Sequence, residues 1–514
     1  MNMSTSKPTA ARRGASAVFL LAALAAASAQ AAVTSGSTGA DGPLNPTVNT
    51  EIQLPESGIL NYTTINIPTG VTVKFKKNTA NTPVFILASG NVTIAGTIDI
   101  RGSDAKASGT YGDGVLGDDG IPGVGGPGGY DGGRGGRDDL ALRPEIIRGG
   151  AGLGPGGGLG GVEGADGCNS IGYYRYFGTG GAYSIAAYQA GGAGYNCGAS
   201  TITVFSKPYG SPLLQPLLGG SGGGGGGGRA NYAGSGGGGG GGAILIASSG
   251  TLQLTGTINA RGGDSGGVAG TNAGGYGAGG SGGAIRLVAT TVAGNGSLLA
   301  EGGCANVSNT ARQNCLATGY ISQNGGAPGR SRLEGEAITF TGSSSPAYVG
   351  DTPGPIFIAG APALSIASIA GTTVPANPTG NADVTLPAST TGPIAVEFQT
   401  TNVPVGNTVL LRVVPAYGQP IEVLSPAIAG TTAAGTATVS VTLPSGPSTL
   451  QATTTYTVVV AGTLDLSRFA QNEKVEKVEV TVSMNGTAKA RLLTASGNAY
   501  DVSYAALLAA GFRG

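Results

Sequence analysis

The 514-residue chain contains no His, no Trp, four Cys and few charged residues. Without His it cannot build a His-based catalytic triad, a His general base, a His-ligated haem or most kinds of catalytic zinc site. Acidic and basic residues balance at 27 each, and charged residues make up 11% of the chain. This composition gives no electrostatic indication of binding to nucleic acid or to an anionic membrane surface.

Glycine, by contrast, is abundant, with 100 residues in the chain, whereas an average protein contains roughly 7% glycine. A glycine ordered in a helix or strand costs roughly 0.5–1 kcal/mol relative to alanine. The glycines must therefore either stay disordered or occupy places where a side chain would not fit.

Residues 1–31 are typical of a secretory signal peptide. A basic start precedes an apolar run at residues 15–27, and a small-x-small cleavage motif follows at residues 29–31. The run is shorter than the 18 to 20 or so apolar residues that cross a membrane. We therefore expect Sec export, a mature chain that starts at Ala32, no transmembrane span, and a location outside the cell or on its outer surface.

Export to an oxidising compartment favours two disulfides among the four cysteines, Cys168, Cys197, Cys304 and Cys315. The sequence alone allows three connectivities. The pairing of Cys168 with Cys197 and of Cys304 with Cys315 is favoured because each pair lies within one glycine-rich segment. Metal binding by these cysteines is disfavoured because the chain has no His and no CxxC motif.

An internal repeat is the most informative feature of the sequence. Residues 84–103, 243–263 and 284–303 each contain two short alternating strands, then Gly, four residues, a charged residue and Gly. A degraded fourth copy occupies residues 331–342, and residues 52–77 alternate in the same way. Strand pairs that recur in one register predict a stacked β-solenoid.

The aligned repeat positions give two further expectations. Ile98, Ile258 and Leu298 each lie two residues after the aligned Gly, so they should point into one core. The charged repeat position holds Arg101, Arg261 and Glu301, which we expect to form a solvated ladder.

The repeat resembles the right-handed parallel β-helix of secreted bacterial glycine-rich surface and adhesin-like proteins and of polysaccharide-active enzymes. The resemblance covers residues 52 to about 349 and rests on the rung pattern. It implies an all-β fold: a β-helix-like domain at residues 32–349, with glycine-rich insertions at about 104–242 and 264–283.

The insertions themselves have a period. From Gly114 to Gly135 every third residue is glycine, and two seven-glycine runs follow at 222–228 and 236–242. Three residues per turn is the polyproline-II repeat, and glycine on each turn lets neighbouring helices approach closely. We expect an ordered sheaf of polyglycine-II-type helices, with a disordered linker as the alternative. In period alone the tracts resemble the glycine-rich tips of some phage adhesins and the Gly-x-x ice-binding proteins of small arthropods.

The composition changes after Ser345, where glycine becomes less frequent and Thr and Val more frequent. Residues 350–391 are expected to be a linker or an edge strand, and residues 392–514 an immunoglobulin-like β-sandwich by shape. The expected strands are Ile394–Gln399, Thr408–Pro415, Ala437–Leu443, Thr454–Val460 and Val478–Ser483.

Carboxylates are the main candidates for chemistry in a chain without His. They gather in one glycine-rich tract as Asp113, Asp118, Asp119, Asp131, Asp138 and Asp139. We interpret them as solvated charges, because a paired-acid hydrolase also needs rigid placement and a cleft for sugar stacking. Calcium binding by Asp113, Asp118, Asp119 and Asp138 is a weaker alternative; no other cofactor is expected.

Aromatic residues give a better candidate for binding. Seven of the chain's 28 aromatic residues lie between Cys168 and Cys197. Tyrosines on a stapled Gly/Ser scaffold provide rigid amphipathic contact area; a local core that supports the disulfide loop is the other interpretation, and the favoured one. The candidate binding residues are Tyr173, Tyr174, Arg175, Tyr176, Phe177, Tyr183, Tyr188 and Tyr195.

Together these features predict an exported, non-enzymatic structural or adhesive protein of the cell surface or extracellular matrix. Its expected partner is a surface or matrix polymer, or another copy of the chain. A β-helical polysaccharide hydrolase or lyase that uses carboxylates is the first alternative. An ice- or surface-binding protein is the second; it would need a flat array of Thr or Ala, which the sequence alone does not reveal.

Overall fold

The structure is a computed structural model. It describes Met1 and residues 33–78, 81–107, 120–136, 148–161, 177–187, 206–228, 233–267, 275–305, 324–357, 361–375, 383–416, 418–460, 464–484, 487–502 and 504–512. The expected all-β class is confirmed, because these residues form four sheets. Their helical content is one short α-helix, α3 (Tyr504–Ala509), and one 3-10 turn, η1 (Ser467–Phe469).

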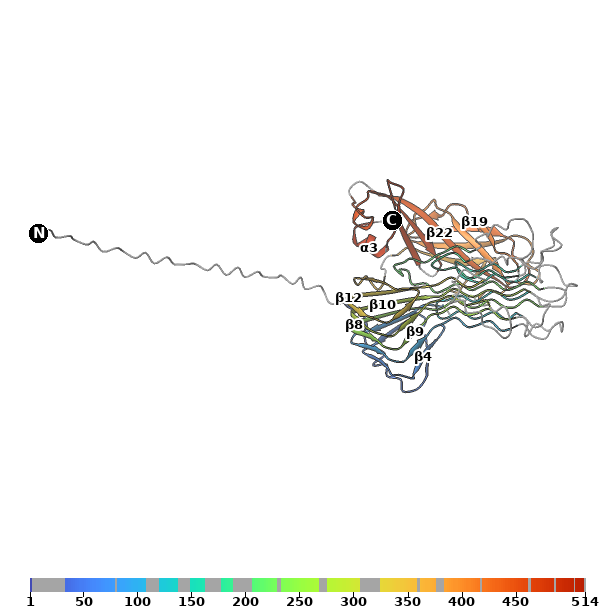
Figure 1. Cartoon of the computed structure of the whole chain (residues 1–514). Helices are drawn as coiled ribbons and strands as arrows, with labels where there is room; N and C mark the ends of the chain where they lie inside the picture. The colour runs from blue at the N-terminus through green and yellow to red at the C-terminus, as the bar shows by residue number, and fades with distance from the viewer. Residues whose placement is uncertain are drawn as a thin grey trace. The chain divides into compact units, whose positions relative to one another are not determined.

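Two parallel sheets contain the repeat units (Figure 1). The first has the order β1 (Thr50–Gln53), β4 (Thr72–Lys76), β7 (Thr97–Asp99), β9 (Thr257–Asn259), β11 (Ser297–Leu299) and β13 (Ser343–Ser345). The second has the order β14 (Val349–Asp351), β12 (Arg330–Phe340), β10 (Ala284–Gly294), β8 (Ala243–Leu254), β5 (Val84–Ala88) and β2 (Ile59–Tyr62). Beside the second half of β8 lie β6 (Val92–Ile94) and then β3 (Ile65–Ile67).

The two parallel sheets share one core, which forms because Val, Ile and Leu alternate with polar residues along the strands. Ile98 pairs with Ile258, and Ile258 with Leu298, on adjacent strands. All three side chains are buried in the same cluster. Their expected position in a common core is therefore confirmed.

Glycine-rich runs continue from the ends of these strands and lie side by side (Figure 1). They have no strand assignment, yet their backbones are hydrogen-bonded to one another. We call them the glycine bundle, which comprises residues 100–106, 120–136, 148–161, 177–182, 219–227, 233–242, 260–266, 275–283 and 324–329.

The central run of the bundle, residues 233–242, is bonded to six neighbouring runs. Successive N–H groups of this run donate to three different neighbouring runs. Each of these three neighbours therefore accepts hydrogen bonds from residues that are three positions apart. Its carbonyl groups accept bonds with the same period from the other three. The neighbours that accept are 130–136, 275–281 and 100–103, and those that donate are 123–126, 220–226 and 263–266.

Close packing explains why this run is glycine. A Cβ atom added at any of positions 237–241 would overlap a carbonyl oxygen of a neighbouring run. Gly123 and Gly126 donate to Gly237 and Gly240, as expected for one edge of a packed helix. Gly120 and Gly129, which continue the same three-residue period, instead form bonds within residues 120–135, with Gly135 and Gly126.

Two antiparallel sheets follow and share a second core. One has the order β16 (Thr372–Thr373), β15 (Ala363–Ile369), β17 (Ile394–Thr401), β21 (Gly435–Val441) and β20 (Ala429–Gly430). The other has the order β19 (Ile421–Leu424), β18 (Val409–Pro415), β22 (Ser448–Val459), β23 (Val475–Ser483), β24 (Thr487–Thr494) and β25 (Ala499–Val502).

All five strands expected after residue 392 are present, with ends shifted by a few residues. The range 350–391, left open as a linker or an edge strand, contains β15. This strand pairs with β17 on one side and with the two-residue β16 on the other. The antiparallel sheets therefore begin at residue 363.

Candidate functional site

Tyr183, one of the candidate binding residues, lies in the interior. Its ring is fully buried and packs edge-to-face against Tyr209, with ring centroids 4.8 Å apart. Its hydroxyl donates to the Leu218 carbonyl at 3.0 Å, and burial raises its pKa well above the ordinary value. The buried ring of Tyr183 therefore agrees with the local core that was weighed against a binding role for these aromatic residues.

Phe177 is the other candidate among the described residues. It stacks on Tyr276, with ring centroids 5.4 Å apart and an interplanar angle of 21°. Both residues are partly exposed, and burial raises the pKa of Tyr276. The remaining candidates, Tyr173, Tyr174, Arg175, Tyr176, Tyr188 and Tyr195, lie outside the described residues.

The cysteine and calcium candidates are described only in part. Cys304 is disulfide-bonded, and Cys168, Cys197 and Cys315 lie outside the described residues. The pairing therefore stays a prediction. Asp113, Asp118, Asp119 and Asp138 also lie outside them. Within the described ranges, no three His, Cys, Asp or Glu side chains are grouped so as to hold a metal ion.

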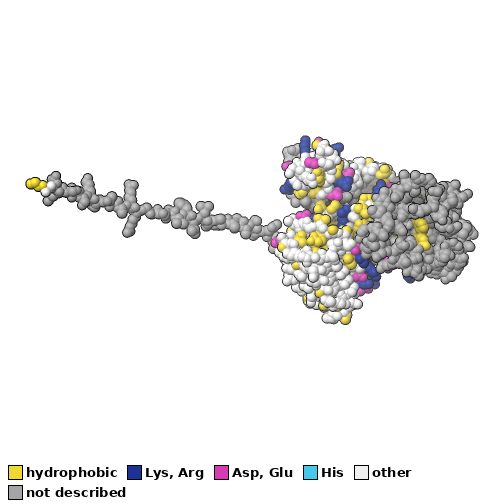
Figure 2. All heavy atoms as spheres, in the orientation of Figure 1, with side chains coloured by type: hydrophobic (Ala, Val, Ile, Leu, Met, Phe, Trp, Pro, Cys, Tyr) yellow, Lys and Arg dark blue, Asp and Glu magenta, His cyan; other side chains and the backbone are white. Residues whose placement is uncertain are grey.

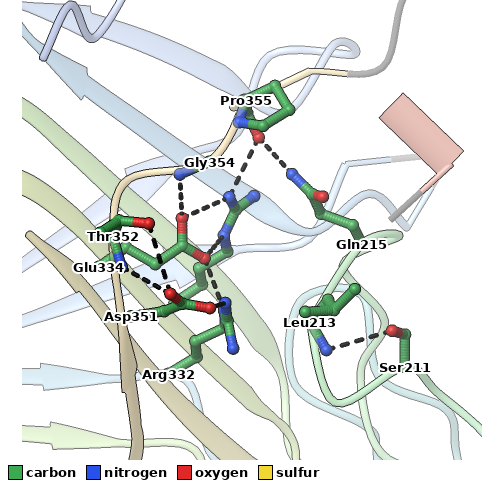
Figure 3. A network of polar contacts seen from close by, with 10 residues as sticks. Ser211, Leu213, Gln215, Arg332, Glu334, Asp351, Thr352, Gly354 and Pro355 are labelled. Carbon is green, nitrogen blue, oxygen red and sulfur yellow. Dashed lines mark hydrogen bonds and ion pairs between the residues drawn. The ribbon is translucent and has the colours of Figure 1, made fainter. Parts of the chain in front are cut away.

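A buried charge network, which the sequence did not reveal, connects β10, β12 and β14 (Figure 3). Arg286 makes two hydrogen bonds of 2.9 Å to Glu334, and both side chains are 2% exposed. Arg332 donates to Glu334 and to Asp351, at 2.7 Å each. Two arginines and two carboxylates thus balance in charge.

The network also forms hydrogen bonds to the backbone of the segment that follows β14, the last strand of this parallel sheet. The Gly354 amide donates to Glu334 at 2.7 Å, and Arg286 donates to the Pro355 carbonyl at 3.0 Å. The Gln215 side chain reaches the same carbonyl from the segment that covers this face (Figure 3). Residues 351–355 are therefore fixed by charged side chains.

The surroundings of Glu334 favour its ionised form. Burial alone would raise its pKa, but hydrogen bonds from Arg286, Gly354 and Arg332 and the charge of Arg286 lower it. Both carboxylate oxygens accept from these donors. An acid–base catalyst needs a pKa near the working pH and a free oxygen, so Glu334 is suited to a structural role.

A groove of about 930 Å³ lies beside this network. Apolar side chains, including Phe85, Leu217 and Phe357, line much of it, and Phe85 and Phe357 contact each other with ring centroids 5.4 Å apart. Arg286 also lines the groove, but its charge is balanced by Glu334. The groove therefore provides an apolar wall rather than an anion site.

The charged repeat position differs from the expected solvated ladder. Arg101 has a half-exposed side chain, but Glu301 is buried and forms an ion pair with Arg261 at 2.6 Å. Opposite charges of the second and third repeat units thus meet at this position, and their ion pair joins the segments that follow the paired strands β9 and β11.

Comparisons with models of protein families, with curated proteins and with solved structures return no match to this chain. Among the described residues, no helix has both the length and the apolar character needed to cross a membrane.

Proposed function

We propose that the chain is an exported structural or adhesive protein of the cell surface or extracellular matrix, without catalytic activity. In this proposal residues 1–31 are a cleaved Sec signal peptide. The parallel sheets form a β-helix-like stack with polyglycine-II-type insertions, and the antiparallel sheets form an immunoglobulin-like sandwich. The proposed partner is a surface or matrix polymer, or a second copy of the chain.

The observation that supports this proposal best is the central run of the glycine bundle, residues 233–242. Its backbone is bonded on all sides, and Cβ atoms are excluded from most of its positions. A region built from backbone alone offers no side chains for chemistry, but its dense hydrogen bonding resists deformation. Such a region suits a rigid spacer or display element.

Hydrogen bonds between the ends of the glycine-rich runs also support the proposal. Five backbone hydrogen bonds join run ends that are far apart in the sequence: Lys106 to Ile121, Gly136 to Gly226, Gly161 to Gly225, Gly266 to Gly236 and Gly275 to Gly227. The described run ends are thus bonded to one another at one end of the bundle. The partly exposed Phe177–Tyr276 pair lies at this end, since Tyr276 follows Gly275, whose amide donates to Gly227. A partly exposed aromatic pair beside rigid, mutually bonded run ends supports adhesion at this end.

Fractionation of cells that produce the full chain tests the proposal. We expect the protein on the outer surface or in the medium, accessible to added protease, with an N-terminus at Ala32. As a matched control, Ala29→Arg combined with Ala31→Arg should block cleavage and keep the precursor with the cell membrane. Accumulation of the uncleaved wild-type chain in the cytoplasm would contradict the proposal.

A further inference from the structure

Five neighbouring strand segments expose a regular array of short side chains. In each segment two outward residues flank one inward residue. The register places these pairs side by side across β3, β6, β8, β10 and β12. We call the ten outward residues the neutral face: Thr64, Asn66, Asn91, Thr93, Thr251, Gln253, Thr291, Ala293, Ala337 and Thr339.

The neutral face has an unusual composition. Its residues are five Thr, two Asn, one Gln and two Ala, without a charge, an aromatic ring or a long aliphatic chain. All ten are exposed or half-exposed. Figure 2 shows that the part of the molecule formed by the parallel strands carries few charged side chains on the side in view. Ionic partners such as nucleic acids or anionic membranes therefore find no counter-charges among these ten residues.

The array is also held in place from below. The inward residues Ile65, Val92, Leu252 and Val292 are at most 3% exposed in the common core. Threonine is β-branched, so its side chain has restricted rotamers. Neighbouring strands are about 4.8 Å apart, and residues two apart along a parallel strand are about 6.6 Å apart. The ten side chains thus form a two-dimensional grid with fixed spacing.

A grid suits a partner that is itself periodic. A small soluble ligand would contact one or two positions, whereas a repeating solid surface can contact all ten at once, and linked weak contacts add strongly. A crystalline polysaccharide is one such surface, but sugar rings usually bind against aromatic side chains, and the grid has none. Seven of the ten residues carry a methyl group and eight a hydroxyl or amide. Methyl groups can confine water while hydroxyls and amides bond to it.

We propose that the neutral face binds ice. Water in ice repeats in two directions with spacings similar to those of the grid, and it is uncharged, as the face is. Water molecules held between the methyl groups and bonded to the hydroxyls would occupy positions that continue into the ice lattice. This inference concerns a surface of the parallel sheets and does not depend on the adhesive role proposed above.

Partition of the mature chain into slowly growing ice tests the inference. We expect the wild-type protein to be enriched in the ice and to slow ice recrystallisation. The variant Thr251→Lys/Thr291→Lys places two long charged side chains at the centre of the face, and it should lose both effects. The matched control, Thr436→Lys/Thr438→Lys, changes exposed threonines of β21 and should keep both.

Circular dichroism and thermal melting establish that each variant is folded. If the first variant does not fold, Thr251→Val/Thr291→Val, which keeps the shape and removes two hydroxyls, replaces it and should weaken the partition. Exclusion of the wild-type chain from ice, or equal partition of both lysine variants, would overturn the inference. Binding to insoluble cellulose or chitin that only the face variant loses, without partition into ice, would also overturn it.

Discussion

Ile98 and Ile258 are 160 positions apart in the sequence, yet they pair in register on adjacent strands, β7 and β9. Between them the chain runs out through the glycine bundle and returns. The Ile100 amide donates to Asn259, and the Ile100 carbonyl accepts from Gly242, so the return path is bonded to the starting strand. The parallel stack and the glycine bundle should therefore fold as one unit.

Replacement of Ile258 by Asp tests this unit. The side chain is fully buried between Ile98 and Leu298, and an unpaired carboxylate there should cost more than about 4 kcal/mol. We expect loss of the folded stack in denaturant unfolding. As controls, Ile258→Val should cost about 1 kcal/mol, and the outward Thr257→Asn less than about 0.5 kcal/mol. A melting curve of Ile258→Asp equal to wild type would show that the stack is wrong.

The glycine bundle gives a second prediction. A Cβ at Gly239 would overlap the Val124 carbonyl, and the surrounding atoms are backbone that cannot turn aside. Gly239→Ala should therefore cost about 3 kcal/mol or more. Val124 itself is 53% exposed, and Val124→Ala should change the unfolding free energy by less than about 0.5 kcal/mol.

Amide hydrogen exchange provides an independent measurement on the unmodified chain. The N–H groups of Gly234, Ser235 and residues 237–242, each bonded to a neighbouring run, should exchange slowly. In Gly239→Ala the slow exchange should be lost across the central run and its six neighbours, not only at position 239. Exchange at random-coil rates in the wild-type protein would support the disordered linker instead.

The repeat and its core could be predicted because alternation with period two is a local signal. Ile98, Ile258 and Leu298 follow from it directly. The glycine period predicts close backbone contact in the same way. It does not say which run contacts which, because six neighbours around residues 233–242 arise only from the three-dimensional path.

Side-chain partners far apart in the sequence were harder to foresee. Arg286 and Glu334 are 48 positions apart, and Glu334 lies in the degraded repeat, where the pattern no longer indicates a partner. The burial of Tyr183 could not be predicted for that residue individually, because local aromatic density does not distinguish a binding surface from a local core. The neutral face could not be predicted from the sequence, because Thr93 and Thr251 are separated by an insertion of about 140 residues. They lie on neighbouring strands only because β6 pairs with β8.

The charge network predicts strong coupling between Arg286 and Glu334. Arg286→Met leaves Glu334 buried with fewer donors and should cost about 3–5 kcal/mol. The double variant Arg286→Met/Glu334→Leu removes both charges, and Arg332 keeps Asp351, so much of the loss should be recovered. Urea unfolding of the two single variants and the double variant measures the coupling; additive losses would contradict the pairing.

The cysteines give a prediction about covalent structure. Because each pair lies within one glycine-rich segment, we expect Cys168 bonded to Cys197 and Cys304 bonded to Cys315. Peptide mapping of the exported protein without reductant should return these two links. A link between Cys197 and Cys304, or four free thiols, would contradict the assignment.

The pH dependence of stability should report on Glu334. Its folded pKa is lowered, so the ionised form stabilises the protein at pH values above the ordinary glutamate pKa of about 4.3. That contribution should disappear as the pH falls through the lowered folded value. Asp351, whose pKa is also lowered by Thr352 and Arg332 against the effect of burial, should act in the same direction.

Unfolding free energies measured between about pH 6 and pH 2 should therefore fall for the wild type and fall less steeply for Glu334→Gln. The exposed neighbour Glu336→Gln is the matched control and should follow the wild-type slope. Equal slopes for all three proteins would show that Glu334 is not held ionised by its arginines.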